Sequence, residues 1–193
     1  DVLANASTPE SQKVMRELLM TPEARNHPVY ARLIQRFVLV GQPDSASAGF
    51  LQESFERETG DVRFGSVVAL GAVTGRLKDQ EKAQELNGYL LEQLASSDDT
   101  DAQRALITSL GNAGFSNNVG ALAEYAGSDD PQMRSTVARA LRTTDTDDAR
   151  TVLFDFLTDD HPYVQRSALR TLSRFDLSDD AIEVLRGHIV DGD

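Results

Sequence analysis

Asp130-Pro131-Gln132-Met133-Arg134 returns as His161-Pro162-Tyr163-Val164-Gln165, with the two prolines 31 positions apart. The segments that follow, Ala138-Arg139-Ala140-Leu141 and Leu169-Arg170-Thr171-Leu172, match at the same spacing. A repeat of this length with apolar residues at helical intervals is typical of stacked helix pairs, each of which needs its neighbours to bury its apolar face. The sequence therefore predicts an all-α solenoid whose binding surface is shared among repeats.

Copies of the same pattern extend upstream. One, at 102–110, lies 31 positions before 133–141. Another begins at Asp61-Val62-Arg63, 40 positions before 101–103, and a weaker one begins at His27-Pro28. We therefore expect a single repeat domain over 1–193, preceded by a helix at 9–20, with about five helix pairs at 27–58, 59–97, 98–128, 129–159 and 160–191.

The second helix of each pair is predicted from apolar residues three or four positions apart, which form one stripe on a helix. These helices are expected at about 44–58, 79–95, 117–126, 147–157 and 179–190. Thr8-Pro9-Glu10 and Thr21-Pro22-Glu23 predict helix starts, with a hydroxyl at the N-cap and proline at the first helical position. Gly111 and Gly114 predict a left-handed turn that ends a helix.

The composition of the chain restricts the kinds of partner that it can bind. The chain carries 31 acidic and 19 basic residues, a formal net charge of −12, which disfavours nucleic acid because a phosphate backbone needs a cationic face. The acidity is typical of a saline habitat or a genome bias, or else of a face for a basic protein partner. No apolar run approaches the roughly 20 residues of a membrane span, so no membrane insertion is expected.

The ends of the chain suggest a piece of something larger. Asp1 is not an initiator methionine, and the residues after it lack the basic and apolar stretches of a secretory signal, so we expect a mature product or a fragment of a longer chain. Neither end shows the polar cap that terminal repeats need, which predicts further polypeptide or self-association. The chain has no cysteine, which is compatible with a reducing or an oxidising compartment, so the sequence does not determine the compartment.

Motifs for catalysis and for cofactor or metal binding are missing. The sequence has no Gly-x-Ser-x-Gly elbow, no phosphate loop, no Rossmann glycine triplet and no EF-hand spacing. Its three histidines are isolated, which does not make a zinc site. Aspartate pairs stand before predicted helices, where capping explains them, although stacking would also align them as an acidic strip: Asp98-Asp99, Asp129-Asp130, Asp159-Asp160 and Asp179-Asp180. We expect no autonomous enzyme, no cofactor and no metal.

The pattern of proline, an aliphatic residue two positions later, arginine, small residues and leucine, seen over 131–141, resembles HEAT repeats. The resemblance covers most of 27–191 and implies a right-handed superhelix whose second helices line the concave face. It also implies a ladder of aspartates and arginines between successive repeats. The residues cast in this structural role are Asp61, Arg63, Asp130, Arg134, Asp160 and Arg166. Gln103 and Gln165 occupy two of the arginine positions, so any ladder is discontinuous.

Two narrower resemblances give alternatives. The string Leu-Ile-Thr-Ser-Leu-Gly-Asn-Ala-Gly at 106–114, within 104–172, looks like the helical domain of vitellogenin-type large lipid-transfer proteins. That resemblance implies a scaffold beside a lipid chamber, with lipid bound only as part of a larger chain. The repeats also resemble the HEAT-type proteins that attach bilins to phycobiliproteins, which implies an accessory subunit of an enzyme.

The first expectation for function is a non-catalytic scaffold that binds a protein partner on its concave face. The stacking presents a preformed surface, so little ordering entropy opposes association. Candidate contacts are polar residues of the second helices that the apolar stripe leaves exposed, namely Gln52, Glu56, Gln84, Asn87, Gln93, Glu124 and Arg150. Four aromatic residues that escape the apolar stripes are candidate anchors, namely Tyr30, Tyr89, Phe115 and Tyr163.

Overall fold

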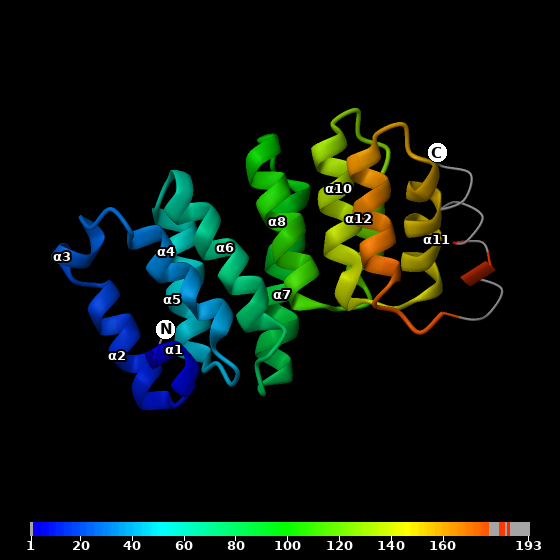
Figure 1. The fold of residues 1–193 in the computed structure, drawn as a ribbon. Coiled ribbons are helices and arrows are strands. Elements are labelled where there is room, and N and C mark those ends of the chain that lie inside the picture. Colours follow the sequence, from blue (N-terminus) through cyan, green and yellow to red (C-terminus); the bar gives the residue numbers. More distant parts are fainter. Residues whose placement is uncertain (1, 178–181, 184, 186–193) are drawn as a thin grey trace. The chain divides into compact units, whose positions relative to one another are not determined.

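A computed structural model describes residues 2–177, 182, 183 and 185, and every regular element among them is helical (Figure 1). The fold is an α solenoid of stacked helices, as the repeat predicts. The chain divides into two compact units, Asp1–Phe115 (unit 1) and Ser116–Asp193 (unit 2). One continuous domain over 1–193 stays a prediction.

Unit 1 is built around one long apolar helix, α6. Its elements are α1 (Val2–Ala6), α2 (Pro9–Leu19), α3 (Pro22–Arg25), α4 (Tyr30–Gln35), the 3-10 turn η1 (Arg36–Leu39), α5 (Ser45–Arg57), α6 (Gly60–Thr74), α7 (Gln80–Ala95) and α8 (Thr100–Ala113). α6 packs against α4, α5, α7 and α8, and its residues Val67, Leu70 and Val73 are fully buried. The predicted helices at 44–58 and 79–95 correspond to α5 and α7.

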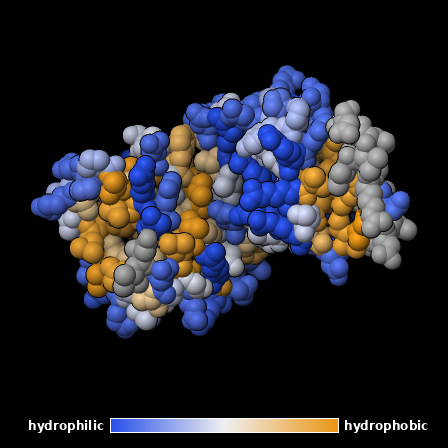
Figure 2. Space-filling view, in the orientation of Figure 1, coloured by the Kyte–Doolittle hydropathy of each residue, from blue (hydrophilic) through white to orange (hydrophobic). Residues whose placement is uncertain are grey.

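The N-terminal helices of unit 1 leave apolar side chains in solvent, and Figure 2 shows apolar residues gathered over this part of the surface. Val14 and Leu18 are one turn apart on α2 and are 41% and 54% exposed, and Met20 and Leu33 nearby are 52% and 39% exposed. Self-association through this end stays a prediction. Among the described helices, none combines the length and the apolar character that a membrane span requires.

Unit 2 repeats the arrangement with shorter helices. Its described elements are α9 (Asn118–Ala123), α10 (Pro131–Ala140), η2 (Leu141–Thr143), α11 (Asp147–Asp155), η3 (Phe156–Thr158) and α12 (Pro162–Leu172). α12 packs along α10 and also against α11 (Figure 1). The helix expected at 117–126 is shorter than predicted, because its last turn gives way to non-helical turns after Ala123. The helix expected at 179–190 lies largely outside the described residues.

The predicted caps are confirmed with one exception. The hydroxyls of Thr8 and Thr21 accept backbone N–H groups at 3.1 and 3.2 Å, and a proline follows each of them. Gly114 ends α8 in the left-handed region, at φ 71°. Gly111 was wrongly assigned to that turn: it is buried inside α8, since a single left-handed residue suffices to end the helix.

Hydroxyl groups join the first helices of neighbouring pairs. Ser109 Oγ of α8 donates to the Val67 carbonyl of α6 at 2.7 Å, and Thr171 Oγ1 of α12 donates to the Ala138 carbonyl of α10 at 2.9 Å. Ser109 and Thr171 are 62 positions apart, which is two periods of the repeat. Both bonds are buried, so each satisfies a hydroxyl that would otherwise be costly to remove from water.

The turns before α8, α10 and α12 are each held by a side chain of the helix that follows. Gln103 Nε2, Arg134 NH1 and Gln165 Nε2 each donate to the backbone carbonyl six positions earlier, at 2.6, 2.8 and 2.6 Å. Glutamine therefore replaces arginine in this role. The long polar side chain at this position keeps the same connection geometry in three consecutive repeats.

Among the described residues, the expected ladder of aspartates and arginines has one rung, formed by Arg134. Arg134 pairs with Asp159 through two bonds of 2.7 and 2.8 Å and reaches Asp160 at 2.6 Å, while Asp130 caps α10. Hydrogen bonds from Arg134 hold the pKa of Asp159 below its ordinary value despite burial. A ladder role for Arg63 and Arg166 is wrong, because both guanidinium groups lie over aromatic rings. The expected discontinuity is confirmed.

A buried polar network, which the sequence did not reveal, ties α2 to the start of α5. Gln12 is 1% exposed, and its Oε1 accepts the backbone N–H of Asp44 at 2.9 Å and the hydroxyl of Ser47 at 3.0 Å. Arg16 NH1 donates to Asp44 at 2.8 Å and to Ser47 at 2.6 Å. Burial alone would raise the pKa of Asp44, but the bonds from Ser47 and Arg16 outweigh it and lower that pKa.

This network makes the stability of the protein depend on pH. The folded pKa of Asp44 lies below its ordinary value of 3.8, so its stabilising contribution is complete above that value and is lost as pH falls through the folded pKa. We expect Asp44→Asn, which keeps an N-cap side chain, to cost about 1.5 kcal/mol at pH 7 and progressively less below pH 3.8.

Urea unfolding of both proteins from neutral to acid pH measures this difference. Repulsion among the other carboxylates affects both proteins alike and cancels in the comparison. A difference in unfolding free energy that is constant across the acid range would contradict the assignment.

Candidate functional site

The second helices of unit 1, α5 and α7, meet at a small polar and aromatic surface. Tyr89 of α7 donates its hydroxyl to Glu56 of α5 at 3.1 Å, and Gln52 lies one turn before Glu56 and donates to it at 3.4 Å. The rings of Tyr89 and Phe55 meet edge to face with centroids 6.4 Å apart. Burial and the bond to Glu56 raise the pKa of Tyr89 above its ordinary value.

Arg63 of α6 also belongs to this cluster, through its contact with Phe55. Its guanidinium carbon lies 4.5 Å from the centre of the Phe55 ring. The connection between α5 and α6 is short, and Gly60 begins α6 in the left-handed region, at φ 55°, where a side chain would be strained. This glycine allows the chain to reverse directly and brings Arg63 back over the ring that precedes it by eight positions.

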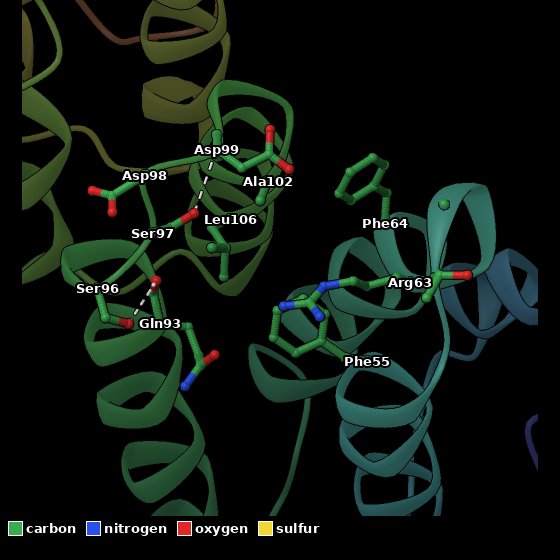
Figure 3. A pocket seen from close by; sticks show the side chains of 12 residues that line it. Phe55, Arg63, Phe64, Gln93, Ser96, Ser97, Asp98, Asp99, Ala102 and Leu106 are labelled. Carbon is green, nitrogen blue, oxygen red and sulfur yellow. Dashed lines mark hydrogen bonds between the residues drawn. The ribbon is translucent and has the colours of Figure 1, made fainter.

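A pocket of about 430 Å³ opens beside Arg63, at the end of the helices where α5 joins α6 and α7 joins α8 (Figure 3). We call it the turn-end pocket. Its lining residues are Phe55, Thr59, Gly60, Arg63, Phe64, Gln93, Ser96, Ser97, Asp98, Asp99, Ala102 and Leu106. The bond from Gln103 to the carbonyl of Ser97 fixes the wall formed by the α7–α8 connection.

The side chains of Arg63 and Gln93, both of which line the turn-end pocket, make no hydrogen bond within the described part of the chain. The guanidinium of Arg63 has the ring of Phe55 as its contact but no ion pair, and the side-chain amide of Gln93 has no bonded partner. Both residues are half-buried, and Figure 3 shows them extending into the space between α6 and α7. Half-buried donors without partners are available to a ligand.

The candidate residues of unit 1 do not share one face. Gln52, Glu56 and Gln93 lie near Tyr89 and the pocket. Gln84 is exposed, but the nine positions that separate it from Gln93 make about two and a half helical turns, so the two point to opposite sides of α7.

The expectation that Asn87 is exposed is wrong. Its side chain is 2% exposed, because it stands on the same stripe of α7 as Ala83 and Leu90, which packs toward the core. The prediction defined the buried stripe of α7 from its apolar residues alone and therefore left Asn87 outside it. Asn87 therefore belongs to the interior of unit 1.

The two candidates in unit 2 have different surroundings. Glu124 is exposed and follows the last residue of α9. Arg150 of α11 donates to Asp145 at 2.6 Å and to the carbonyl of Asp176 at 3.1 Å, and the bond to Asp145 raises its pKa. Arg150 therefore already helps to hold unit 2 together. Partner contacts at Glu124 and Arg150 stay predictions.

Comparison with known families decides the classification. A family model of HEAT repeats matches residues 87–161 and again 130–193, which together cover more than half of the chain. This chain belongs to the HEAT-repeat family. The family match does not support the narrower resemblances of this HEAT-repeat protein to lipid-transfer proteins and to bilin-attaching proteins.

Solved structures support the fold of the HEAT-repeat protein. The crystal structure of an engineered protein matches with a TM-score of 0.53 and 16% sequence identity, over 92% of this chain and 84% of that one. At this identity the likeness shows the fold alone. No curated protein matches the sequence.

Two of the three central residues of the candidate site were not singled out as binding residues from the sequence. Arg63 was expected in a structural ladder and Phe55 was not a candidate, whereas Tyr89 was named as a candidate aromatic anchor. The signal for the cluster was the short connection at 58–60, with a glycine between an aromatic and an arginine eight positions apart. A reversal of that kind brings both onto neighbouring turns of adjacent helices.

Proposed function

We propose that this HEAT-repeat protein is a non-catalytic scaffold that binds a partner protein over the second helices α5 and α7 of unit 1. HEAT repeats typically mediate protein interactions, and the family is generally non-catalytic. The observation that carries the proposal is the cluster of Tyr89, Phe55 and Arg63, which is held in place by Glu56. Tyrosine and arginine are the residue types most enriched among energetically dominant interface contacts.

The charge of this surface points to a partner with basic residues. Glu56 and Glu92 are exposed on α5 and α7, as are Asp98 and Asp99 beyond the end of α7, and the whole chain has a net charge of −12. Such a surface speeds association with a positively charged partner and discourages acidic ones. The preformed aromatic cluster reduces the entropy that would be lost on binding.

The test places a photo-crosslinking amino acid at Gln52 or at Gln84 and identifies the captured protein in native extract by mass spectrometry. We expect one partner to be captured from Gln52 and not from Gln84, which faces the other side of α7 from the pocket. With that partner purified, Tyr89→Ala should weaken binding about tenfold or more, because a buried aromatic contact is lost. Gln84→Ala should change the dissociation constant less than about twofold. Equal capture from both positions, or unchanged binding by Tyr89→Ala, would refute the proposed surface.

A further inference from the structure

We propose that the turn-end pocket of unit 1 receives the carboxyl terminus of a partner chain, with Arg63 and Gln93 holding the carboxylate. The inference rests on the proposed function, since it names the part of the partner that α5 and α7 would bind. It also adds a chemical specificity that a general scaffold role does not require.

The donors of Arg63 are ready for a planar anion. The guanidinium of Arg63 lies over the ring of Phe55, 4.5 Å from its centre, and its N–H groups have no protein acceptors among the described residues. A planar guanidinium matches the two oxygens of a carboxylate, with which it forms paired, charge-assisted bonds. Arg134 already makes such a pair with Asp159 in unit 2, whereas Arg63 pairs with no carboxylate among the described residues.

The rest of the pocket favours an apolar group attached to that carboxylate. Phe64, Ala102 and Leu106 provide an apolar wall, and the amide of Gln93 can donate to a carboxylate oxygen. The volume of about 430 Å³ is within the range of small-ligand sites and exceeds what a carboxylate alone would fill. A C-terminal residue with a large apolar side chain offers both groups at once. An aspartate or glutamate side chain offers only the first.

Acidic residues at the edge of the pocket restrict the ligand further. Asp98 and Asp99 line the pocket and are exposed, and Figure 3 shows the carboxylate of Asp98 pointing away from Arg63. These charges repel an acidic segment but attract lysine or arginine. The favoured ligand is therefore a basic chain end: a lysine or arginine followed by an apolar C-terminal residue.

The probe for this proposal is the dipeptide N-acetyl-Lys-Phe with a free carboxylate, compared with its carboxamide. Heteronuclear NMR of the isotope-labelled chain follows the backbone amides of Gly60, Ser96 and Ser97, which line the pocket. We expect these amides to shift and the free acid to bind about tenfold more tightly than the carboxamide, since a bond to a charged group is lost in the latter. N-acetyl-Glu-Phe should bind about threefold more weakly than N-acetyl-Lys-Phe, and salt should reduce that difference.

Variants separate the role of Arg63 from a general charge effect. Arg63→Gln should weaken binding of the free acid about tenfold, and Arg63→Lys should have an intermediate effect because it keeps the charge without the planar donors. The matched control is Arg57→Gln, which removes the same charge from an exposed residue of α5 paired with Glu53. It should leave binding unchanged.

Several outcomes would overturn the inference. Equal binding of the acid and the carboxamide would show that the carboxylate is not recognised. Acetate binding as tightly as the dipeptide would show that the apolar wall contributes nothing and that any carboxylate suffices. An equal loss in Arg57→Gln and Arg63→Gln would reduce the effect to net charge. Arg63→Lys, with its thermal unfolding checked, keeps the result interpretable if Arg63→Gln lowers the stability of the fold.

The result is distinguishable from a failure of the proposed function. If a partner is captured from Gln52 in both wild-type and Arg63→Gln proteins, the surface of α5 and α7 binds but the pocket does not receive the chain end. If no partner is captured while the dipeptide still binds, the proposed carboxylate site is supported and the proposed scaffold role of α5 and α7 is refuted.

Discussion

Gly71→Ala is expected to destabilise the protein by about 3 kcal/mol, because overpacking against rigid backbone cannot be relieved by side-chain movement. A Cβ atom at Gly71 would overlap the backbone carbonyl of Ser109 on α8. Ser109 cannot move away without breaking the bond from its own hydroxyl to the carbonyl of Val67. Gly75, one turn later, meets the carbonyl of Ala113 in the same way. The close crossing of α6 and α8 therefore requires glycine.

The matched control is Gly88→Ala in the middle of α7. A Cβ atom there meets nothing within 4 Å, so the substitution should raise helix propensity and stabilise by about 0.5–1 kcal/mol. Urea unfolding followed by circular dichroism measures both changes. Opposite signs are expected for two identical substitutions in neighbouring helices. A neutral result for Gly71→Ala would mean that α6 and α8 do not cross this closely in solution.

Arg134→Gln is expected to cost about 3 kcal/mol, since breaking a largely buried ion pair leaves a carboxylate without its counter-charge. The side chains of Arg134 and Asp159 are 13% and 7% exposed. Glutamine can keep the bond to the turn carbonyl that Gln103 and Gln165 make in the neighbouring repeats, so the loss reports the ion pairs with Asp159 and the exposed Asp160. Arg134→Ala should cost about 1 kcal/mol more, because the turn carbonyl then loses its donor as well.

Unfolding free energies of the two variants and of Arg166→Gln provide the measurement. Arg166 is exposed, and its guanidinium carbon lies 5.9 Å from the ring centre of Tyr163, so its loss should change stability by less than about 0.5 kcal/mol. Arg134→Gln should also raise the pKa of Asp159, because Arg134 is the main cause of its lowering. Equal stability of Arg134→Gln and Arg166→Gln would show that the rung contributes nothing measurable.

Local rules predicted the helices of this chain well because local chemistry determines them. Thr8, Asp130 and Gly114 act where their cap chemistry requires, and the apolar stripes locate α5, α7 and α10. The same local rules were less accurate for residues whose burial depends on how their helix packs against a neighbouring helix. Asn87 is polar, but it lies on the stripe of α7 that also carries Ala83 and Leu90 and packs toward the core, so its polarity gave the wrong prediction.

The candidate site was only partly predictable, because its main contacts are between helices. Gln52, Glu56 and Gln93 were found from their polarity on second helices. The contact of Arg63 with Phe55 depends on how sharply the chain reverses at Gly60, and the network of Gln12 and Asp44 joins residues 32 positions apart. Neither contact joins residues at a spacing that the period of a helix would predict. Such pairs become visible only when the packing of adjacent helices is known.

The side chain that holds the turn in three repeats has an evolutionary consequence. Gln103, Arg134 and Gln165 each bond to the carbonyl six positions earlier, so a 31-residue block counted from Ser97, Ser128 or Asp159, one position before the predicted repeat boundary, contains both ends of this bond. A gene duplication that copies such a block would copy its turn contact as well. The pairing of Arg134 with Asp159 differs, because it joins two successive blocks of this kind and must be re-established whenever one of them is replaced.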